Sequence, residues 1–324
     1  MAFIVPKFEI GEIDPVLAYA VEAVPRFCER IGCDNPRTIH NAFMAALVAN
    51  ANRIHETLTA AYVPRDPASR RLLTLMESVL VRELETDGHE HLLHALKFME
   101  QGGNVLLVSN HTSGADTLVL DWVANKVASD AAHSWTYMAG HVVNLYLLPL
   151  VVAGGVNRLQ IFSERYAGLV SNDLRQQMRA QNASALLYLR ALAEGGGQCV
   201  VLYPEGGRGE GALKPGEPQT MQIAQLIARV SPEGLLVLPS YVASADILPV
   251  RRTQNEFNEF VEHARPGNAT LRFGPGIPWQ DLQPSGCMNP AALRSYLIGR
   301  VMMGIADLAP TLKARGPHNR KGSK

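Results

Sequence analysis

The sequence predicts an α/β protein in which a mostly parallel, mixed sheet is flanked by helices and preceded by a small N-terminal helical bundle. Three observations lead to this prediction: apolar residues recur at helical spacing up to about residue 99, the pattern changes at Gly102, and short apolar runs then alternate with helical stretches. Such alternation is typical of a largely parallel sheet that is covered on both faces. The predicted units are residues 1–87 for the bundle, 88–312 for the α/β domain and 313–324 for a basic, disordered tail.

The N-terminal region carries two apolar stripes at helical spacing. Asp66 and Pro67 supply a capping residue and a first-turn proline for the second of them. The stripes, whose members recur at steps of three and four residues, are Ile39, Phe43, Leu47, Ala51, Ile54 and Leu58, and then Leu72, Leu73, Met76, Val79, Leu80 and Leu84. Together with residues 16–31, they predict a small bundle of helices.

Short apolar runs after Gly102 predict the strands of the sheet. They cover residues 105–108, 135–139, 159–162, 199–203, 235–242 and 270–273, and the helical stretches among them include 115–127, 172–193 and 221–230. Functional groups of α/β proteins gather at the carboxyl ends of the strands. Polar residues directly after these runs are therefore the candidates for function.

Charge and composition argue for a globular protein and against a nucleic-acid-binding one. The 324 residues include 30 basic and 30 acidic side chains, 47% are hydrophobic and 19% are charged. This composition is typical of a globular protein with a large core, and it provides no overall field that would attract nucleic acid. We therefore expect no nucleic-acid partner.

Cysteine and histidine spacings predict no metal site. The four cysteines, which match no paired zinc spacing, are Cys28, Cys33, Cys199 and Cys287. We interpret them as reduced thiols. His89, His91 and His94 do not share one helical face, so we interpret them as the solvated start of a helix.

The sequence predicts a cytoplasmic protein that is soluble or peripherally associated with a membrane. Residues 1–15 carry acids and a proline where a signal or transit peptide needs a basic or uninterrupted apolar start. The longest window without a charged residue or a histidine, residues 142–157, is interrupted by Pro149 and Gly154. It is shorter than the ~20 apolar residues of a spanning helix, and it is the candidate for contact with a membrane surface.

His111 follows the end of a predicted strand, and Asp116 comes five residues later. On a continuous helix these residues would be separated by roughly 140° and could not meet. The residues between them, Thr112-Ser113-Gly114, form a suitable turn before the helix 115–127. An imidazole that a carboxylate holds in one tautomer is a general base for a hydroxyl. On spacing alone, a structural role for the two residues is the alternative.

A glycine-rich loop with one arginine follows the predicted strand 199–203. Glycine lets backbone amides approach an anionic group closely, and Arg208 can bind a phosphate in a bidentate way. A nucleotide-binding loop is the alternative, but Pro215 and Pro218 interrupt the helix that a dinucleotide fingerprint must open. The Gly-Lys-Ser/Thr ending of a triphosphate-binding loop is also absent from residues 204–211.

Together these stretches resemble the glycerolipid acyltransferases, which include the glycerol-3-phosphate and lysophosphatidate acyltransferases. The ordered blocks are Asn110-His111-x-x-x-x-Asp116, then Tyr203-Pro204-Glu205-Gly206-Gly207-Arg208, then Leu238-Pro239. The layout looks most like the soluble, plastid-type glycerol-3-phosphate acyltransferases and their bacterial relatives. The resemblance implies an O-acyltransferase of phospholipid synthesis that moves a fatty acyl group from a thioester to glycerol 3-phosphate.

The resemblance implies the catalytic roles. His111 would deprotonate the acceptor hydroxyl, which then attacks the thioester directly, and Asp116 would orient the imidazole. No acyl-enzyme is needed, in line with the absence of a G-x-S-x-G elbow. The resemblance implies no bound cofactor, because acyl carrier protein or coenzyme A brings the acyl group as a co-substrate.

The resemblance also implies an acceptor-binding block with two departures. The matching residues are Arg165, Glu205, Gly206, Gly207 and Arg208. Arg208 would hold the phosphate of the acceptor. Tyr166 stands where plastid-type relatives carry a histidine, and Glu210 stands where they carry a second arginine. Arg158 is a candidate to compensate for the lost charge.

Three alternatives to glycerol-3-phosphate acylation stay open. Pro204-Glu205-Gly206 is closer to the lysophosphatidate-type block, which makes lysophosphatidate a second candidate acceptor. The second alternative is a non-catalytic relative that binds lipid or carrier protein, although the presence of both His111 and Asp116 argues against it. The third is a nucleotide-dependent enzyme.

Overall fold

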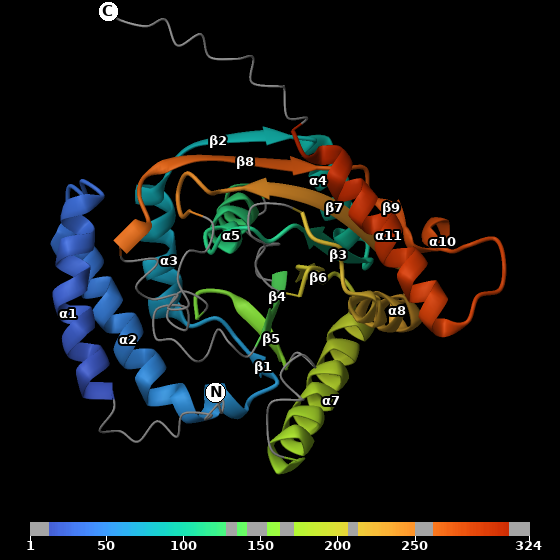
Figure 1. Ribbon diagram of the computed structural model, residues 1–324, viewed down its shortest axis with the longest axis horizontal. Helices are drawn as coiled ribbons and strands as arrows, with labels where there is room; N and C mark the ends of the chain where they lie inside the picture. Colours follow the sequence, from blue (N-terminus) through green and yellow to red (C-terminus); the bar gives the residue numbers. More distant parts are fainter. Residues whose placement is uncertain are drawn as a thin grey trace, which may run out of the picture.

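A computed structural model describes residues 13–127, 135–140, 154–162, 172–206, 213–249 and 262–310 (Figure 1). The helices in these ranges are α1 (Ile13–Arg30), α2 (Pro36–Thr59), α3 (Pro67–Leu80), α4 (His89–Glu100), α5 (Asp116–Val127), α7 (Asn172–Gly195), α8 (Met221–Val230), α10 (Trp279–Leu282) and α11 (Pro290–Leu308). The strands are β1 (Tyr62–Val63), β2 (Val81–Asp87), β3 (Asn104–Ser109), β4 (Trp135–Gly140), β5 (Asn157–Ile161), β6 (Cys199–Leu202), β7 (Leu235–Ala243), β8 (Gly267–Phe273) and β9 (Ile277–Pro278).

The described strands form one mixed sheet. Their order is β1-β5-β4-β6-β3-β7-β8-β2, and β9 pairs with β7. Neighbours from β5 to β7 are parallel, as are β8 and β2, whereas β1–β5, β7–β8 and β7–β9 are antiparallel. This confirms the predicted fold class, a mostly parallel mixed sheet flanked by helices (Figure 1). Because β3 lies between β6 and β7, it is an inner strand. Its carboxyl end is therefore flanked by a strand on each side.

Helices cover both faces of the sheet, and β3 shows how. Val105 and Leu107 pack in one apolar cluster with buried residues of α1 to α5. Leu106 and Val108 pack in a second cluster with residues of α7, α8 and α11. Since successive side chains of a strand point to opposite faces, a strand that is buried on both faces needs an uninterrupted apolar run. This requirement explains why the sequence predicts β3 so clearly.

The N-terminal region differs from the prediction in two places. The second apolar stripe ends with α3 at Leu80, and Leu84 lies on β2, which pairs in parallel with β8. In addition, β1 pairs with β5 at the other end of the sheet. Two strands of the sheet therefore precede residue 88. The division into units and the separate bundle stay predictions, and the tail lies outside the described residues.

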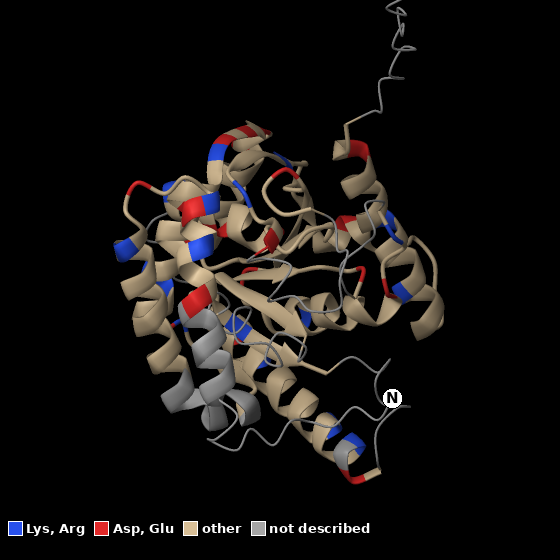
Figure 2. Cartoon of the chain, turned by 60° about the vertical axis from the view of Figure 1, so that its left-hand side comes forward, with Lys and Arg blue, Asp and Glu red and all other residues tan. Residues whose placement is uncertain are grey.

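Several local predictions are confirmed. Asp66 caps α3, because its carboxylate accepts a hydrogen bond of 2.7 Å from the backbone N–H of Ser69, and Pro67 is the first residue of that helix. His89 begins α4, and the side chain of His94 is exposed. None of the four cysteines is paired in a disulfide in the structure, and their reduced state stays a prediction. Figure 2 shows basic and acidic residues interspersed over the visible elements, in line with the net charge of zero.

A helix that crosses a bilayer needs about 20 mostly apolar residues. No helix within the described ranges is both long and apolar enough to cross a membrane. Residues 141–153, which make up most of the long uncharged window, lie outside those ranges.

A buried cluster of ionisable side chains joins α3 to α5. Arg70 of α3 forms an ion pair with Asp121 of α5, and its Nη2 lies 3.3 Å from each carboxylate oxygen of Glu77. Glu77 is 3% exposed and Asp121 is 6% exposed. Asn125 adds a hydrogen bond of 3.1 Å from its Nδ2 to Oδ2 of Asp121. The cluster thus fixes α5, the helix that begins with Asp116.

Glu77→Gln is expected to reduce the loss of stability at alkaline pH. Burial and the adjacent Asp121 raise the pKa of Glu77 to about 9, against the opposing effect of Arg70. The folded chain therefore keeps a proton that the unfolded chain releases at the ordinary pKa of 4.5. The stability that this proton provides is complete below the unfolded pKa and is lost as the pH rises toward the folded one. Glutamine cannot lose a proton, so it removes this dependence.

The measurement is thermal unfolding between about pH 6 and about pH 9, where the unfolded chain has released this proton and the folded chain still holds it. The wild type and the control Glu100→Gln, which changes an exposed glutamate, should lose stability with rising pH more steeply than Glu77→Gln. Parallel curves for all three proteins would mean that Glu77 is not protonated in the folded chain.

Candidate active site

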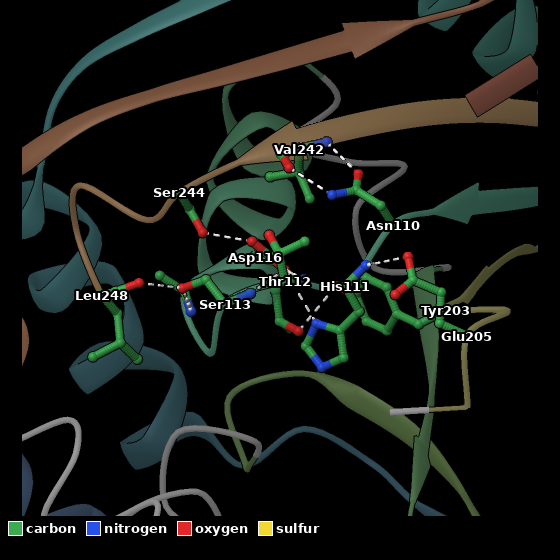
Figure 3. A network of polar contacts seen from close by, with 12 residues as sticks. Asn110, His111, Thr112, Ser113, Asp116, Tyr203, Glu205, Val242, Ser244 and Leu248 are labelled. Carbon is green, nitrogen blue, oxygen red and sulfur yellow. Dashed lines mark hydrogen bonds and ion pairs between the residues drawn. The ribbon is translucent and has the colours of Figure 1, made fainter. Parts of the chain in front are cut away.

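The loop after β3 is anchored to β7 by Asn110. Its side-chain Nδ2 donates a hydrogen bond of 2.8 Å to the carbonyl of Val242, and its Oδ1 accepts one of 2.7 Å from the N–H of the same residue (Figure 3). Asn110 is 1% exposed. These two bonds extend the parallel pairing of β3 and β7 past the end of β3, and they fix the backbone from which His111 projects.

His111 and Asp116 meet because the chain turns between them. Nδ1 of His111 lies 3.2 Å from Oδ2 of Asp116. The same oxygen accepts hydrogen bonds from the backbone N–H groups of Thr112 (2.7 Å) and Ser113 (2.8 Å). The Ser113 hydroxyl donates to the carbonyl of Leu248 at 2.7 Å, which ties the turn to the segment after β7. The structure thus has the predicted turn, and α5 begins directly after it, at Asp116.

The pair joins a fully buried carboxylate to a partly exposed imidazole. The Asp116 side chain is 0% exposed, whereas that of His111 is 19% exposed. A buried carboxylate must be compensated by hydrogen bonds or charge, and Asp116 receives donors on both oxygens, since the Ser244 hydroxyl donates to Oδ1 at 2.5 Å. With Nδ1–H donated to Asp116, Nε2 of His111 carries the lone pair that can accept a proton.

Tyr203 supports the imidazole from one face. The two rings stack with their centroids 4.2 Å apart and their planes at 19°. The tyrosine hydroxyl lies 3.0 Å from the hydroxyl of Thr117 on α5. Burial, followed by the charge of Asp116, raises the pKa of Tyr203, so the phenol stays neutral. Tyr203 therefore restricts the orientation of the His111 ring without adding a charge.

Glu205 reaches the site through a tight turn after β6. The N–H of Gly206 donates to the carbonyl of Tyr203 at 3.3 Å, and Gly206 has a φ of 67°, which a residue with a side chain rarely adopts. Oε1 of Glu205 accepts a hydrogen bond of 3.4 Å from the N–H of His111. Burial raises the pKa of Glu205 to about 7, although the amides of His111 and Lys214 oppose this. Glu205 therefore contacts the backbone of the His111 loop.

Of the remaining predicted residues, the structure describes Arg158, which lies away from this point. Arg158 is 1% exposed on β5, and β4 and β6 separate that strand from β3. At about 4.8 Å per strand, its backbone is roughly 14 Å from that of β3. Arg165, Gly207 and Arg208 lie outside the described residues, as do the two departures at Tyr166 and Glu210. The roles predicted for all of these residues stay predictions.

Sequence reasoning missed Ser244 as a residue of the site. It contacts Asp116 from a position 128 residues further along the chain. The available signal is its place two residues after the apolar run 235–242, at the carboxyl end of a strand next to β3. Within the described residues, no group of three or more His, Cys, Asp or Glu side chains is arranged to hold a metal ion.

Comparison with known proteins shows the family of this chain. The family model named Acyltransferase matches residues 89–250, which is half of the 324-residue chain. The chain belongs to the Acyltransferase family. The matched range includes His111, Asp116, Glu205 and Ser244.

Two curated relatives are similar to parts of this Acyltransferase family member. The chloroplastic glycerol-3-phosphate acyltransferase of Spinacia oleracea is 31% identical over 130 residues, which are 40% of this chain and 27% of the relative. The enzyme of the same name from Phaseolus vulgaris is 28% identical over 228 residues, which are 67% of this chain and 48% of the relative. These matches confirm the resemblance to glycerolipid acyltransferases. The chain spans less than half the length of either relative.

One solved structure is also similar to this chain. The crystal structure of the 1-acyl-sn-glycerophosphate (LPA) acyltransferase PlsC from Thermotoga maritima aligns with a TM-score of 0.40 and 15% identity, over 85% of this chain and 98% of that chain.

Proposed function

We propose that this chain transfers a fatty acyl group from a thioester, on acyl carrier protein or coenzyme A, to the hydroxyl of glycerol 3-phosphate. The observation that carries the proposal is the contact of 3.2 Å between the buried Asp116 and the partly exposed His111 at the carboxyl end of β3. The contact lies within the range that matches the family model. We place the reaction in the cytoplasm, on a protein that is soluble or peripherally bound to a membrane.

The proposed mechanism uses the His111–Asp116 pair as a general base. Nε2 of His111 takes the proton of the acceptor hydroxyl while the hydroxyl oxygen attacks the carbonyl carbon of the thioester. The new C–O bond forms, the C–S bond breaks, and the proton passes from the imidazolium to the leaving thiolate. Asp116 holds the ring by Nδ1 and stabilises the positive charge that develops on it. The products are the acyl ester and a free thiol, and no bound cofactor takes part.

Two acceptors are candidates, glycerol 3-phosphate and lysophosphatidate. The names of the curated relatives favour glycerol 3-phosphate. The Pro204-Glu205-Gly206 turn and the exchanges at Tyr166 and Glu210 favour lysophosphatidate as the second candidate. Both acceptors carry a phosphate, which Arg208 and Arg165 would bind under either proposal.

Thiol release from the wild-type chain separates the candidates. Palmitoyl-coenzyme A and palmitoyl-acyl carrier protein are each offered with glycerol 3-phosphate, with lysophosphatidate or with no acceptor. Release that depends on glycerol 3-phosphate supports the proposal, whereas release with lysophosphatidate alone identifies the second acceptor. If neither acceptor raises thiol release above the acceptor-free rate on either carrier, the assignment is overturned. A non-catalytic relative is then favoured.

A further inference from the structure

Ser244 contacts Asp116 from a position 128 residues further along the chain. It follows the last residue of β7 and is 0% exposed. Its hydroxyl donates to Oδ1 of Asp116 at 2.5 Å (Figure 3). The segment that carries it is fixed on both sides, because Val242 is bonded to Asn110 and the carbonyl of Leu248 is bonded to Ser113. The position of the hydroxyl is thus set by the same loop that it contacts.

The two oxygens of Asp116 have different donors. Oδ2 faces the two backbone amides of the turn at 2.7 and 2.8 Å and His111 Nδ1 at 3.2 Å. Oδ1 accepts from Ser244. The contact with His111 is the longest of the four, so it is the first that a rotation of the carboxylate would break. The terminal torsion of aspartate is broad, so bonds to both oxygens are needed to fix its plane.

We propose that Ser244 is a positioning residue, which acts through Asp116 to hold the imidazole of His111 in its reactive orientation. Without the hydroxyl, the buried Oδ1 loses the donor that the segment after β7 provides, and the carboxylate turns toward other donors at the expense of Nδ1. The proposal rests on the proposed function, since the orientation of His111 matters for turnover only if His111 is the base.

The test compares Ser244→Ala with a matched control, Ser240→Ala. Ser240 is also 0% exposed on β7, but its hydroxyl donates to the carbonyl of Val108 at 3.4 Å and not to Asp116. Ser244→Ala should lower kcat about tenfold, the scale expected for one lost hydrogen bond to a buried charge, with KM for both substrates within about twofold. Ser240→Ala should leave kcat within about twofold of the wild type.

A double-mutant cycle separates positioning from a merely structural role. If Ser244 acts through Asp116, adding Ser244→Ala to Asp116→Asn should lower kcat by less than about twofold more. A full tenfold loss in that background would overturn the proposal, as would an unchanged kcat in folded Ser244→Ala. If the alanine variant does not fold, Ser244→Cys replaces it, because the thiol nearly keeps the volume and is a weak donor. The same loss of kcat is then expected.

A second readout does not depend on turnover. The proton NMR signal of the Nδ1–H of His111, assigned by its absence in His111→Ala, should be lost or shifted in Ser244→Ala and kept in Ser240→Ala. An unchanged signal in Ser244→Ala would contradict the positioning role. If the wild type transfers no acyl group, the proposed function fails, whereas this signal still decides whether Ser244 holds the pair.

Discussion

Replacing His111 by alanine is expected to lower kcat/KM for acyl transfer about 10³-fold, the scale of a lost general base. The fold should survive, because the side chain is 19% exposed on a loop and the other donors to Asp116 remain. The free energy of unfolding is expected to change by less than about 1 kcal/mol. Initial rates of thiol release at several acceptor concentrations, together with urea unfolding, measure both quantities.

His94→Ala is the matched control for this change. His94 is an exposed histidine of α4, within the range matched by the family model, and its removal should leave the rate within about twofold of the wild type. Asp116→Asn should lower the rate in the same direction as His111→Ala, since an amide cannot stabilise the imidazolium as a carboxylate does. A general base contributes at least ~10²-fold to the rate. A His111→Ala protein that keeps a tenth or more of the activity would therefore exclude His111 as the base.

Arg70→Met is expected to lower the free energy of unfolding by about 3 kcal/mol, as breaking a buried ion pair from one side does. The change leaves the side chains of Glu77 and Asp121, which are 4% and 9% exposed, without their guanidinium group. The methionine is of similar length and removes only the charge and the hydrogen bonds. Urea-induced unfolding followed by circular dichroism is the measurement.

Arg71→Met provides the comparison for this stability effect. Arg71 is the next residue of α3 and is exposed, so its replacement should change the free energy of unfolding by no more than about 0.5 kcal/mol. Equal effects of the two changes would show that the cluster between α3 and α5 does not stabilise the fold.

The sequence predicts the central strands well and the edges poorly. β3, β6 and most of β7 are buried on both faces, so they read as largely continuous apolar runs. β2 is an edge strand with exposed charges, and it continues the apolar stripe of α3, so its sequence reads as helix up to Leu84. Its partner β8 lies some 180 residues away in the sequence, as the contact between Glu83 and Asn268 shows. No local pattern can reveal such a pairing.

The candidate site also has one part that the sequence predicts and another part that it does not. The turn between His111 and Asp116 is predicted from the turn residues that lie between them, because both side chains belong to one short segment. The supports of that segment come from elsewhere: the backbone of Val242 holds Asn110, and Ser244 holds Asp116. These contacts depend on the order of strands in the sheet, which the sequence does not state.

The most direct test of the central claim is detection of the acylated product. Wild type and His111→Ala are incubated with isotope-labelled palmitoyl thioester and glycerol 3-phosphate, and the labelled ester is quantified by mass spectrometry. The account predicts labelled acylglycerol phosphate with the wild type and almost none with the variant. Equal amounts of ester from both proteins would show that the His111–Asp116 pair is not the base of this reaction.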